Sequence, residues 1–250
     1  EQDFGGDFET EAVYRDPEFM ARINADGWML WPPIRYSYDT INYNLPSPAP
    51  SAPTTDNLLG TDDQGRDVVA RVLYGFRISV LFGLALTLFS SLIGVTAGAL
   101  QGFYGGKVDM ITQRFIEIWS SMPSLYILII FSALFAPGFW TLLLILLLFS
   151  WTHLVDVVRA EFLRARSLDY VRSARALGVG NVTLMYRHIL PNAVAPVLVS
   201  ASFGVASAIL IESSLSFLGF GVQPPTPSWG DLLSQSRTFM DIAWWLTFFP

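Results

Sequence analysis

Three long runs without a charged residue constrain the fold of this chain more than any other feature. The runs cover residues 78–100, 118–155 and 189–211. A helix needs roughly 20 apolar residues to cross the hydrocarbon core of a bilayer, so each run can span it and the middle run can do so twice. The turn-forming pair Pro137-Gly138 divides the middle run and predicts two spans joined by a hairpin, near 115–135 and 139–157.

The composition also favours a membrane protein. Apolar residues make up 52% of the 250 residues and charged residues only 14%, a balance too apolar for a soluble domain of this length. A last apolar run starts at Ile242 and continues to the end of the chain. Cysteine is absent, which excludes disulfides, thiol catalysis and cysteine metal sites. We therefore predict an all-α polytopic membrane protein.

The distribution of arginine predicts the orientation in the membrane. Residues 159–187 carry six arginines and two acids, whereas residues 1–76 carry thirteen acids and five arginines. Because basic loops stay on the cytoplasmic side, 159–187 is expected inside and the acidic first segment outside. That segment lacks the pattern of a signal peptide. We interpret the chain as a fragment that lacks its first span and most of its last.

Glycines recur along the first charge-free run and just after it. Gly83, Gly94, Gly98 and Gly102 follow one another at short helical spacings. A helix surface without side chains lets a second helix approach closely, so we expect these glycines at helix contacts.

A polar helix–turn–helix is expected between two of the spans. Residues 170–177 are uninterrupted helix formers, and Gly178 supplies the permissive backbone of a helix C-terminus. Residues 182–190 resume a helical pattern, which Pro191 is expected to close. A polar loop of this kind usually serves as a docking element for another protein.

The arginines of this loop form two pairs. Arg172 and Arg175 lie three apart on one face of the first short helix, where they are expected to meet a protein partner. Arg164 and Arg166 lie nearer the membrane, where anionic lipid headgroups would attract them. The two pairs are therefore expected to differ in function.

A turn-rich segment precedes the first span. Gly60 and Gly65 bracket a turn, and either Thr61 or Asp62 can cap a following helix through its side-chain oxygen. Helical spacing then continues over 66–77. The pattern predicts a capped interfacial helix that enters the membrane.

The polar loop resembles the cytoplasmic coupling loop of ABC importer permeases. Arg172 stands where that family has an acidic residue, and the positions that match its pattern are Ser173, Ala174, Gly178, Leu190 and Pro191. The resemblance implies that these residues, together with Arg175, couple the chain to an ATPase. Mechanically, the loop would act as a lever on the spans.

Further segments resemble the dipeptide and oligopeptide permeases of this family, namely 59–68, 73–79, 216–225 and 227–230. Residues 3–6 and 27–35 are similar to the extracytoplasmic insertion of the Yej-type permease, a peptide importer subunit also associated with uptake of microcin C-like peptides. The resemblance implies a type I ABC importer transmembrane domain (MetI-like). Its expected parts are a periplasmic segment at 1–58, an interfacial elbow at 59–76 and the transmembrane domain at 77–250, with the coupling loop at 159–190.

The resemblance also implies a location and a set of partners. The chain is expected in the bacterial inner membrane beside a second homologous permease, with ABC ATPase subunits inside and a periplasmic peptide-binding protein outside. ATP and Mg²⁺ would be bound by the ATPase, and no cofactor, enzymatic activity or nucleic-acid binding is expected of this chain. An importer for another small solute, such as nickel, is the alternative within the family.

Catalytic functions find little support in the residues. The one phosphate-loop candidate, 102–108, has Gln101 before it in place of the first glycine and ends on Val108 in place of a hydroxyl. His153 and Asp156 lie three apart, but two ligands without a third make a weak metal site. We interpret them as a helix-end pair near the headgroups.

Glu212 is the acidic residue at the outer end of the third run. Such a residue either reaches water or turns inward to line a pathway or a helix interface. A secondary transporter would need several ionisable residues near mid-membrane, and the charge-free runs offer almost none. An intramembrane enzyme would have only His153 at depth.

Overall fold

The computed structural model describes residues 17–250, which fall into two compact units, 17–36 and 37–250. The first unit contains helix α1 (Pro17–Asp26) and an extended segment, in which the Arg35 guanidinium lies 5.1 Å from the centre of the Trp31 ring. The expected insertion motif at 27–35 is in this unit. Its other half, 3–6, lies outside the described residues.

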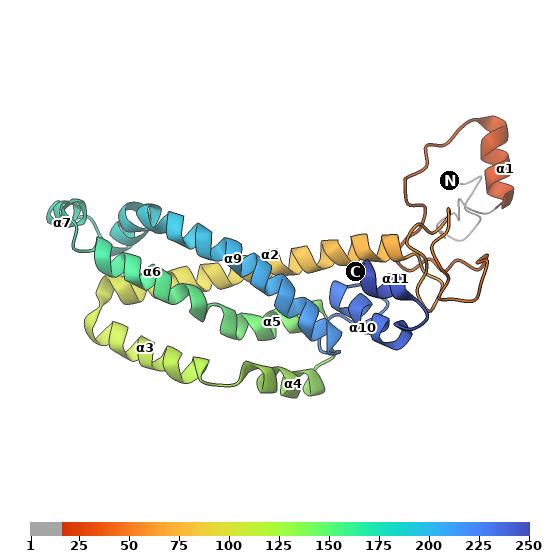
Figure 1. The fold of residues 1–250 in the computed structure, drawn as a ribbon. Coiled ribbons are helices and arrows are strands. Elements are labelled where there is room, and N and C mark those ends of the chain that lie inside the picture. Colours follow the sequence, from red (N-terminus) through yellow and green to blue (C-terminus); the bar gives the residue numbers. More distant parts are fainter. Residues whose placement is uncertain (1–16) are drawn as a thin grey trace. The chain divides into compact units, whose positions relative to one another are not determined.

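The second unit is a bundle of helices (Figure 1). The helices are α2 (Val68–Tyr104), α3 (Gly106–Ser120), α4 (Ser124–Leu134), α5 (Phe139–Ser150), α6 (Thr152–Ala165), α7 (Asp169–Ala176), α8 (Asn181–Thr183), the π-helical turn η1 (Leu184–Ile189), α9 (Leu190–Phe217), α10 (Trp229–Phe239) and α11 (Trp244–Phe248). Figure 1 shows α7 at one end of this bundle and α10 with α11 at the other.

Three helical stretches of the described chain are long and apolar enough to cross a bilayer: Val68–Tyr104, Phe139–Ala165 and Asn181–Phe217. A fourth crossing exists if α3 and α4 together make one bent span. The predicted hairpin at Pro137-Gly138 is confirmed, because α4 ends before this pair and α5 begins after it.

The first span begins differently from the prediction. Its N-cap is Asp67, whose carboxylate accepts a hydrogen bond from the backbone N–H of Ala70 at 2.8 Å, so the predicted capping by Thr61 or Asp62 is wrong. No separate interfacial helix precedes the span, because α2 runs without a break from Val68 to Tyr104. The predicted turn is confirmed by the positive φ angles of Gly60 and Gly65, 79° and 80°.

The α3–α4 segment corrects the prediction of one straight span over 115–135. The two helices are bent by 66° at the break between Ser120 and Ser124. Pro123 explains the break, since proline lacks the N–H of a helical hydrogen bond and disfavours helical geometry in the residue before it.

The second half of the predicted polar loop belongs to a membrane-spanning helix, because the helical stretch Asn181–Phe217 includes it. Pro191 does not close a second short helix as predicted, because the helix that starts at Asn181 continues through it to Phe217. The π-helical turn accommodates the proline: the Leu190 N–H bonds back to the Met185 carbonyl, five residues earlier. The Asn192 side chain donates to the His188 carbonyl at 2.9 Å, which supplies a donor at the same turn. On the other side, α6 extends to Ala165, so the segment between the spans is shorter than 159–190.

Glycines on α2 create its closest contact, which is with α6. A Cβ built on Gly94, Gly98 or Gly102 would lie 2.7, 2.6 or 2.5 Å from the nearest atom of 151–162. Gly83 meets α9 in the same way, with Ile209 at 2.7 Å. The predicted close approach at these glycines is confirmed.

The substitution Gly98→Ala tests this contact. The added methyl group would lie 2.6 Å from the Val155 carbonyl oxygen and 2.8 Å from the Val158 Cβ, so α2 and α6 must separate. We expect the free energy of unfolding to fall by about 1–3 kcal/mol, the usual cost of overpacking, in an SDS titration of the detergent-solubilised protein. Gly138→Ala is the matched control, since a Cβ there has no neighbour within 4 Å. Equal stability of the two variants would contradict the close packing.

Candidate functional site

Helix α7 is anchored through one face. Val171 and Ala174 are buried in an apolar cluster with residues from the ends of α2 and α6, from η1 and from the start of α9, among them Phe103, Phe162, Ile189 and Ala193. The opposite face carries exposed Arg172 and Ser173. A displacement of α7 must therefore move the ends of three long helices with it.

Gly178 forms the corner after α7. Its φ of +82° lies in the left-handed region, as predicted from the sequence. The Val179 N–H donates to the Ala174 carbonyl at 3.1 Å and the Gly178 N–H to the Arg175 carbonyl at 3.0 Å, which is the Schellman pattern of a helix C-terminus. Val179 also packs against the apolar cluster, so the corner is held on both sides.

The structure separates the two arginines that the sequence placed together. The Arg175 guanidinium lies 5.3 Å from the centre of the Phe103 ring and so contacts the chain itself. Arg172 is exposed and forms no ion pair with any described residue. Exposed apolar side chains lie on both sides of the corner: Leu177 before it, at 84% exposure, and Val182 and Tyr186 after it, at 67% and 44%. Arg172 and these residues form the accessible tip.

The other predicted coupling residues lie at the start of the long helix. Leu190 is partly buried against the same apolar cluster, whereas Pro191 is exposed. Both belong to the first turn of α9, so they connect the tip directly to a membrane-spanning helix.

Arg164 and Arg166, the second predicted pair, also make different contacts. Arg164 is 71% exposed and pairs with Glu161 at 2.5 Å, a position open to headgroups. Arg166 turns toward the α2–α3 corner, where its Nη1 donates to the Phe103 carbonyl at 3.5 Å. Nearby, Arg159 forms an ion pair with Asp109 of α3. These contacts tie together the ends of α2, α3 and α6 that lie nearest α7.

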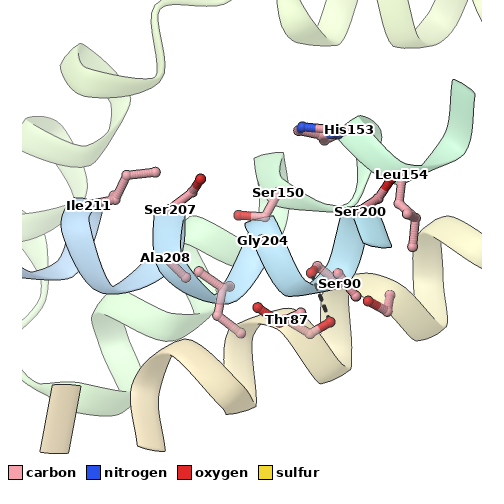
Figure 2. A pocket seen from close by; sticks show the side chains of 13 residues that line it. Thr87, Ser90, Ser150, His153, Leu154, Ser200, Gly204, Ser207, Ala208 and Ile211 are labelled. Atoms are coloured by element: carbon pink, nitrogen blue, oxygen red, sulfur yellow. Dashed lines mark hydrogen bonds between the residues drawn. The ribbon is translucent and has the colours of Figure 1, made fainter. Parts of the chain in front are cut away.

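A cavity of about 160 Å³ lies among α2, α5, α6 and α9. Figure 2 shows Thr87 and Ser90 on α2, Ser200 and Ser207 on α9, and His153 on α6, all around this space. The interpretation of His153 and Asp156 as a helix-end pair is wrong, because the span continues to Ala165 and His153 lies near its middle. Asp156 instead accepts a hydrogen bond from the Gln113 side chain at 3.3 Å.

Glu212 is fully buried, so the interpretation that it reaches water is wrong. Its carboxylate accepts hydrogen bonds from the Ser79 hydroxyl of α2 and the Ser216 hydroxyl of α9, each at 2.7 Å. These bonds place Glu212 at a helix contact within the chain. It does not line the cavity around His153.

A buried charge network at the opposite end of α2 was not anticipated from the sequence. The fully buried Arg71 donates to Asp62 at 2.5 Å and to Asp231 of α10 at 2.9 Å, and Arg66 donates to Asp62 at 2.7 Å. Burial raises the pKa of the Asp231 carboxyl above its ordinary value, while the Arg71 guanidinium opposes that shift. The available signal was Arg71 itself, a charge one helical turn inside an apolar helix.

This network joins the turn before α2 to the end of the chain. The Trp245 indole of α11 donates to the Thr61 carbonyl at 3.1 Å, and Gly75 of α2 packs against the Ser228–Trp229 backbone. At the same end, a Cβ on Gly230 would lie 2.1 Å from the Ser213 carbonyl of α9. The segment 59–67, α10 and α11 therefore form one packed unit around the start of α2.

Comparison with known proteins assigns the family. The model of the binding-protein-dependent transport system inner membrane component matches residues 74–249. The chain belongs to this family. It is therefore an inner-membrane permease component, in agreement with the fold expected from the resemblance of its loop.

Individual relatives refine the assignment. The permease is 52% identical to the peptidoglycan transport system permease protein YejE of Agrobacterium fabrum, over 98% of this chain and 70% of the relative. It is also 52% identical to the inner membrane ABC transporter permease protein YejE of Escherichia coli, over 98% and 72%. Identity to the dipeptide transport system permease protein DppC of Haemophilus influenzae is 40%, over 77% and 65%. The predicted likeness to Yej-type permeases and dipeptide permeases is confirmed.

Arg71→Met tests the buried network of the permease. Loss of the guanidinium leaves Asp231 and one side of Asp62 buried without their partner, which we expect to lower the free energy of unfolding by about 3–5 kcal/mol. SDS titration of the solubilised protein measures it. Arg114→Met is the control, because the Arg114–Glu117 pair is exposed and such pairs contribute about 0–1 kcal/mol. A similar small loss in both variants would contradict a structural role for the network.

Gly178→Val tests the corner of the tip. A β-branched residue in the left-handed region costs about 1–2 kcal/mol, and no atom lies within 4 Å of the new Cβ, so the strain is purely local. We expect normal membrane insertion but increased cleavage of 176–182 by added protease. Gly180→Val is the matched control, since Gly180 has an ordinary φ of −66° and equally open surroundings. Equal cleavage of both variants would show that the corner does not require glycine.

Proposed function

We propose that this permease is one of two membrane subunits of an ATP-driven importer for peptides in the bacterial inner membrane. A second, homologous permease completes the pathway, ABC ATPase subunits bind ATP and Mg²⁺ inside, and a periplasmic binding protein delivers the cargo. ATP hydrolysis belongs to the ATPase chains. Two of the relatives are named as permeases of peptidoglycan and dipeptide transport systems, which supports a cargo that contains peptide bonds.

The observation that carries this proposal is the attachment of α7. Its inner face is buried among the ends of α2, α6 and α9, while Arg172 and the apolar side chains around Leu177 are free to bind a partner. An ATPase that grips this tip and moves on ATP binding would displace all three helices together. The proposed mechanism is alternation of the pathway between outward-facing and inward-facing states by this displacement.

Differences in burial support a division of roles among the proposed coupling residues. Arg172, Ser173 and the side chains beyond Gly178 form the proposed ATPase contact. Ala174 and Leu190 act indirectly, because they face the apolar cluster and hold the tip on the bundle. Arg175 has a shared role, since its guanidinium also lies over the Phe103 ring.

Arg172→Glu tests the coupling surface in the full-length permease. A reversed charge against an acidic rim of the ATPase should weaken assembly, and we expect the amount of ATPase retained in a pull-down to fall at least about tenfold, with ATP-dependent peptide uptake falling in parallel. Arg164→Glu makes the same charge change at another exposed site near the membrane. Equal retention of the ATPase by both variants would show that the α7 face is only a solvated surface.

A further inference from the structure

The cavity among α2, α5, α6 and α9 has walls of an unusual kind for the middle of a membrane protein. Hydroxyl groups from three helices face it, including Thr87, Ser91, Ser150, Ser200 and Ser207. His153 is the only titratable residue that lines it. The remaining wall is aliphatic or small. Most of the wall is apolar, and its polar groups are scattered hydroxyls and one imidazole, so the site is almost uncharged.

The hydroxyls of this cavity differ from serines elsewhere in the same helices. The hydroxyls of Ser202 and Ser214 on α9 each donate a hydrogen bond to the backbone carbonyl four residues earlier, at 2.8 and 2.7 Å. That bond is the ordinary solution for a hydroxyl in an apolar setting. Ser91 and Ser200 are partly buried beside the cavity and Ser207 is exposed at it, and in the described chain the side chains of these three residues form no hydrogen bond. Hydroxyls left in this way are available to a bound molecule.

The position and size of the cavity suit a passage. Ser91 lies near the middle of α2, His153 near the middle of the Phe139–Ala165 span and Ser200 near the middle of the Asn181–Phe217 span. The volume of about 160 Å³ greatly exceeds the roughly 10–15 Å³ that one water needs on the same measure. The cavity can therefore hold a short stretch of chain together with water.

We propose that this cavity is a site on the translocation pathway that binds the backbone of a passing peptide. The proposal rests on peptide import as the function of the complex. A hydroxyl both donates and accepts a hydrogen bond, so it can bind either the N–H or the C=O of a peptide unit. The His153 imidazole adds a donor for a carbonyl or the terminal carboxylate. Since the lining includes no acid, lysine or arginine, binding is independent of the side-chain charge of the cargo.

Such a lining also suits transport. Conduction needs sites that bind well enough to admit the cargo and weakly enough to release it. Scattered single hydroxyls on three helices meet both conditions. The cavity is also lined by α2, α6 and α9, whose ends contribute to the apolar cluster around α7, so movement of the tip would change the spacing of the groups around it.

Cysteine accessibility tests the location of the site. The chain has no cysteine, so Ser200→Cys and Ser207→Cys each introduce one thiol into the full-length permease, assembled with its partner subunits in proteoliposomes. The probe is the hydrophilic reagent methanethiosulfonate ethylsulfonate. We expect both thiols to react, and alanine peptides of mixed length with the binding protein to slow the reaction at least about fivefold by occupancy. Ser202→Cys is the matched control, since Ser202 lies on the same helix outside the lining and should stay unreactive. Equal reactivity at 200, 202 and 207, or no protection by peptide, would overturn the site.

Uptake measurements separate this inference from the proposed function. The wild-type complex must first take up alanine peptides in an ATP-dependent manner, and failure at this step would overturn peptide import itself. If it succeeds, the double variant Ser200→Val with Ser207→Val should lose about tenfold in uptake through two lost hydrogen bonds, equally for acidic, basic and neutral peptides. Ser202→Val should transport normally. Wild-type uptake by the double variant, or a loss confined to peptides of one charge, would overturn the backbone site while peptide import stands.

Discussion

The contact between α2 and α6 is the constraint on which the rest of this permease depends. At Gly94, Gly98 and Gly102 the two backbones approach to distances that no side chain on α2 would permit. Apolar side chains gain little by leaving lipid for protein, so close packing of this kind is a main source of association between helices in a membrane. The same contact brings together the C-terminal ends of α2 and α6, which contribute to the apolar cluster around α7. The positions of both the tip and the cavity therefore depend on the close packing at these three glycines.

Charge is used differently at the two ends of the bundle. At the α10 end, Asp62, Arg71 and Asp231 are buried and connect segments that are far apart in sequence. At the α7 end, Arg159 and Arg166 join neighbouring helices, and Arg172 remains free at the tip. A rigid α10 end and an accessible α7 end are consistent with the proposal that a partner bound at α7 moves the helices. Glu212 belongs to the rigid half, where its hydrogen bond from Ser79 fastens α9 to α2 and its bond from Ser216 lies within α9.

The sequence predicts this architecture well where one local rule decides the outcome. Charge-free runs identified the spans, and Gly178 was correctly assigned a left-handed turn because few other residues adopt it. Predictions were wrong where two rules compete. Asp62 is a good N-cap residue, but its carboxylate is taken by Arg66 and Arg71, and Asp67 caps the helix instead. Pro123 breaks its helix whereas Pro191 does not, because a π-helical turn accommodates only the second. The cavity lay beyond prediction, since its serines come from three helices whose facing sides depend on packing.

The π-helical turn at Leu184–Ile189 gives α9 a property that a plain helix lacks. A π turn contains about one residue more than the α turn that it replaces, and one residue corresponds to about 100° of rotation around a helix axis. Conversion of this turn to α geometry would therefore rotate the part of α9 next to it, while the Ser79–Glu212 hydrogen bond holds the far end, so the helix would twist between the two points. Ser200 and Ser207 would then leave the cavity for another face. A change in this turn would therefore rotate part of α9, and the turn lies between the proposed ATPase contact and the hydroxyls of the proposed peptide site.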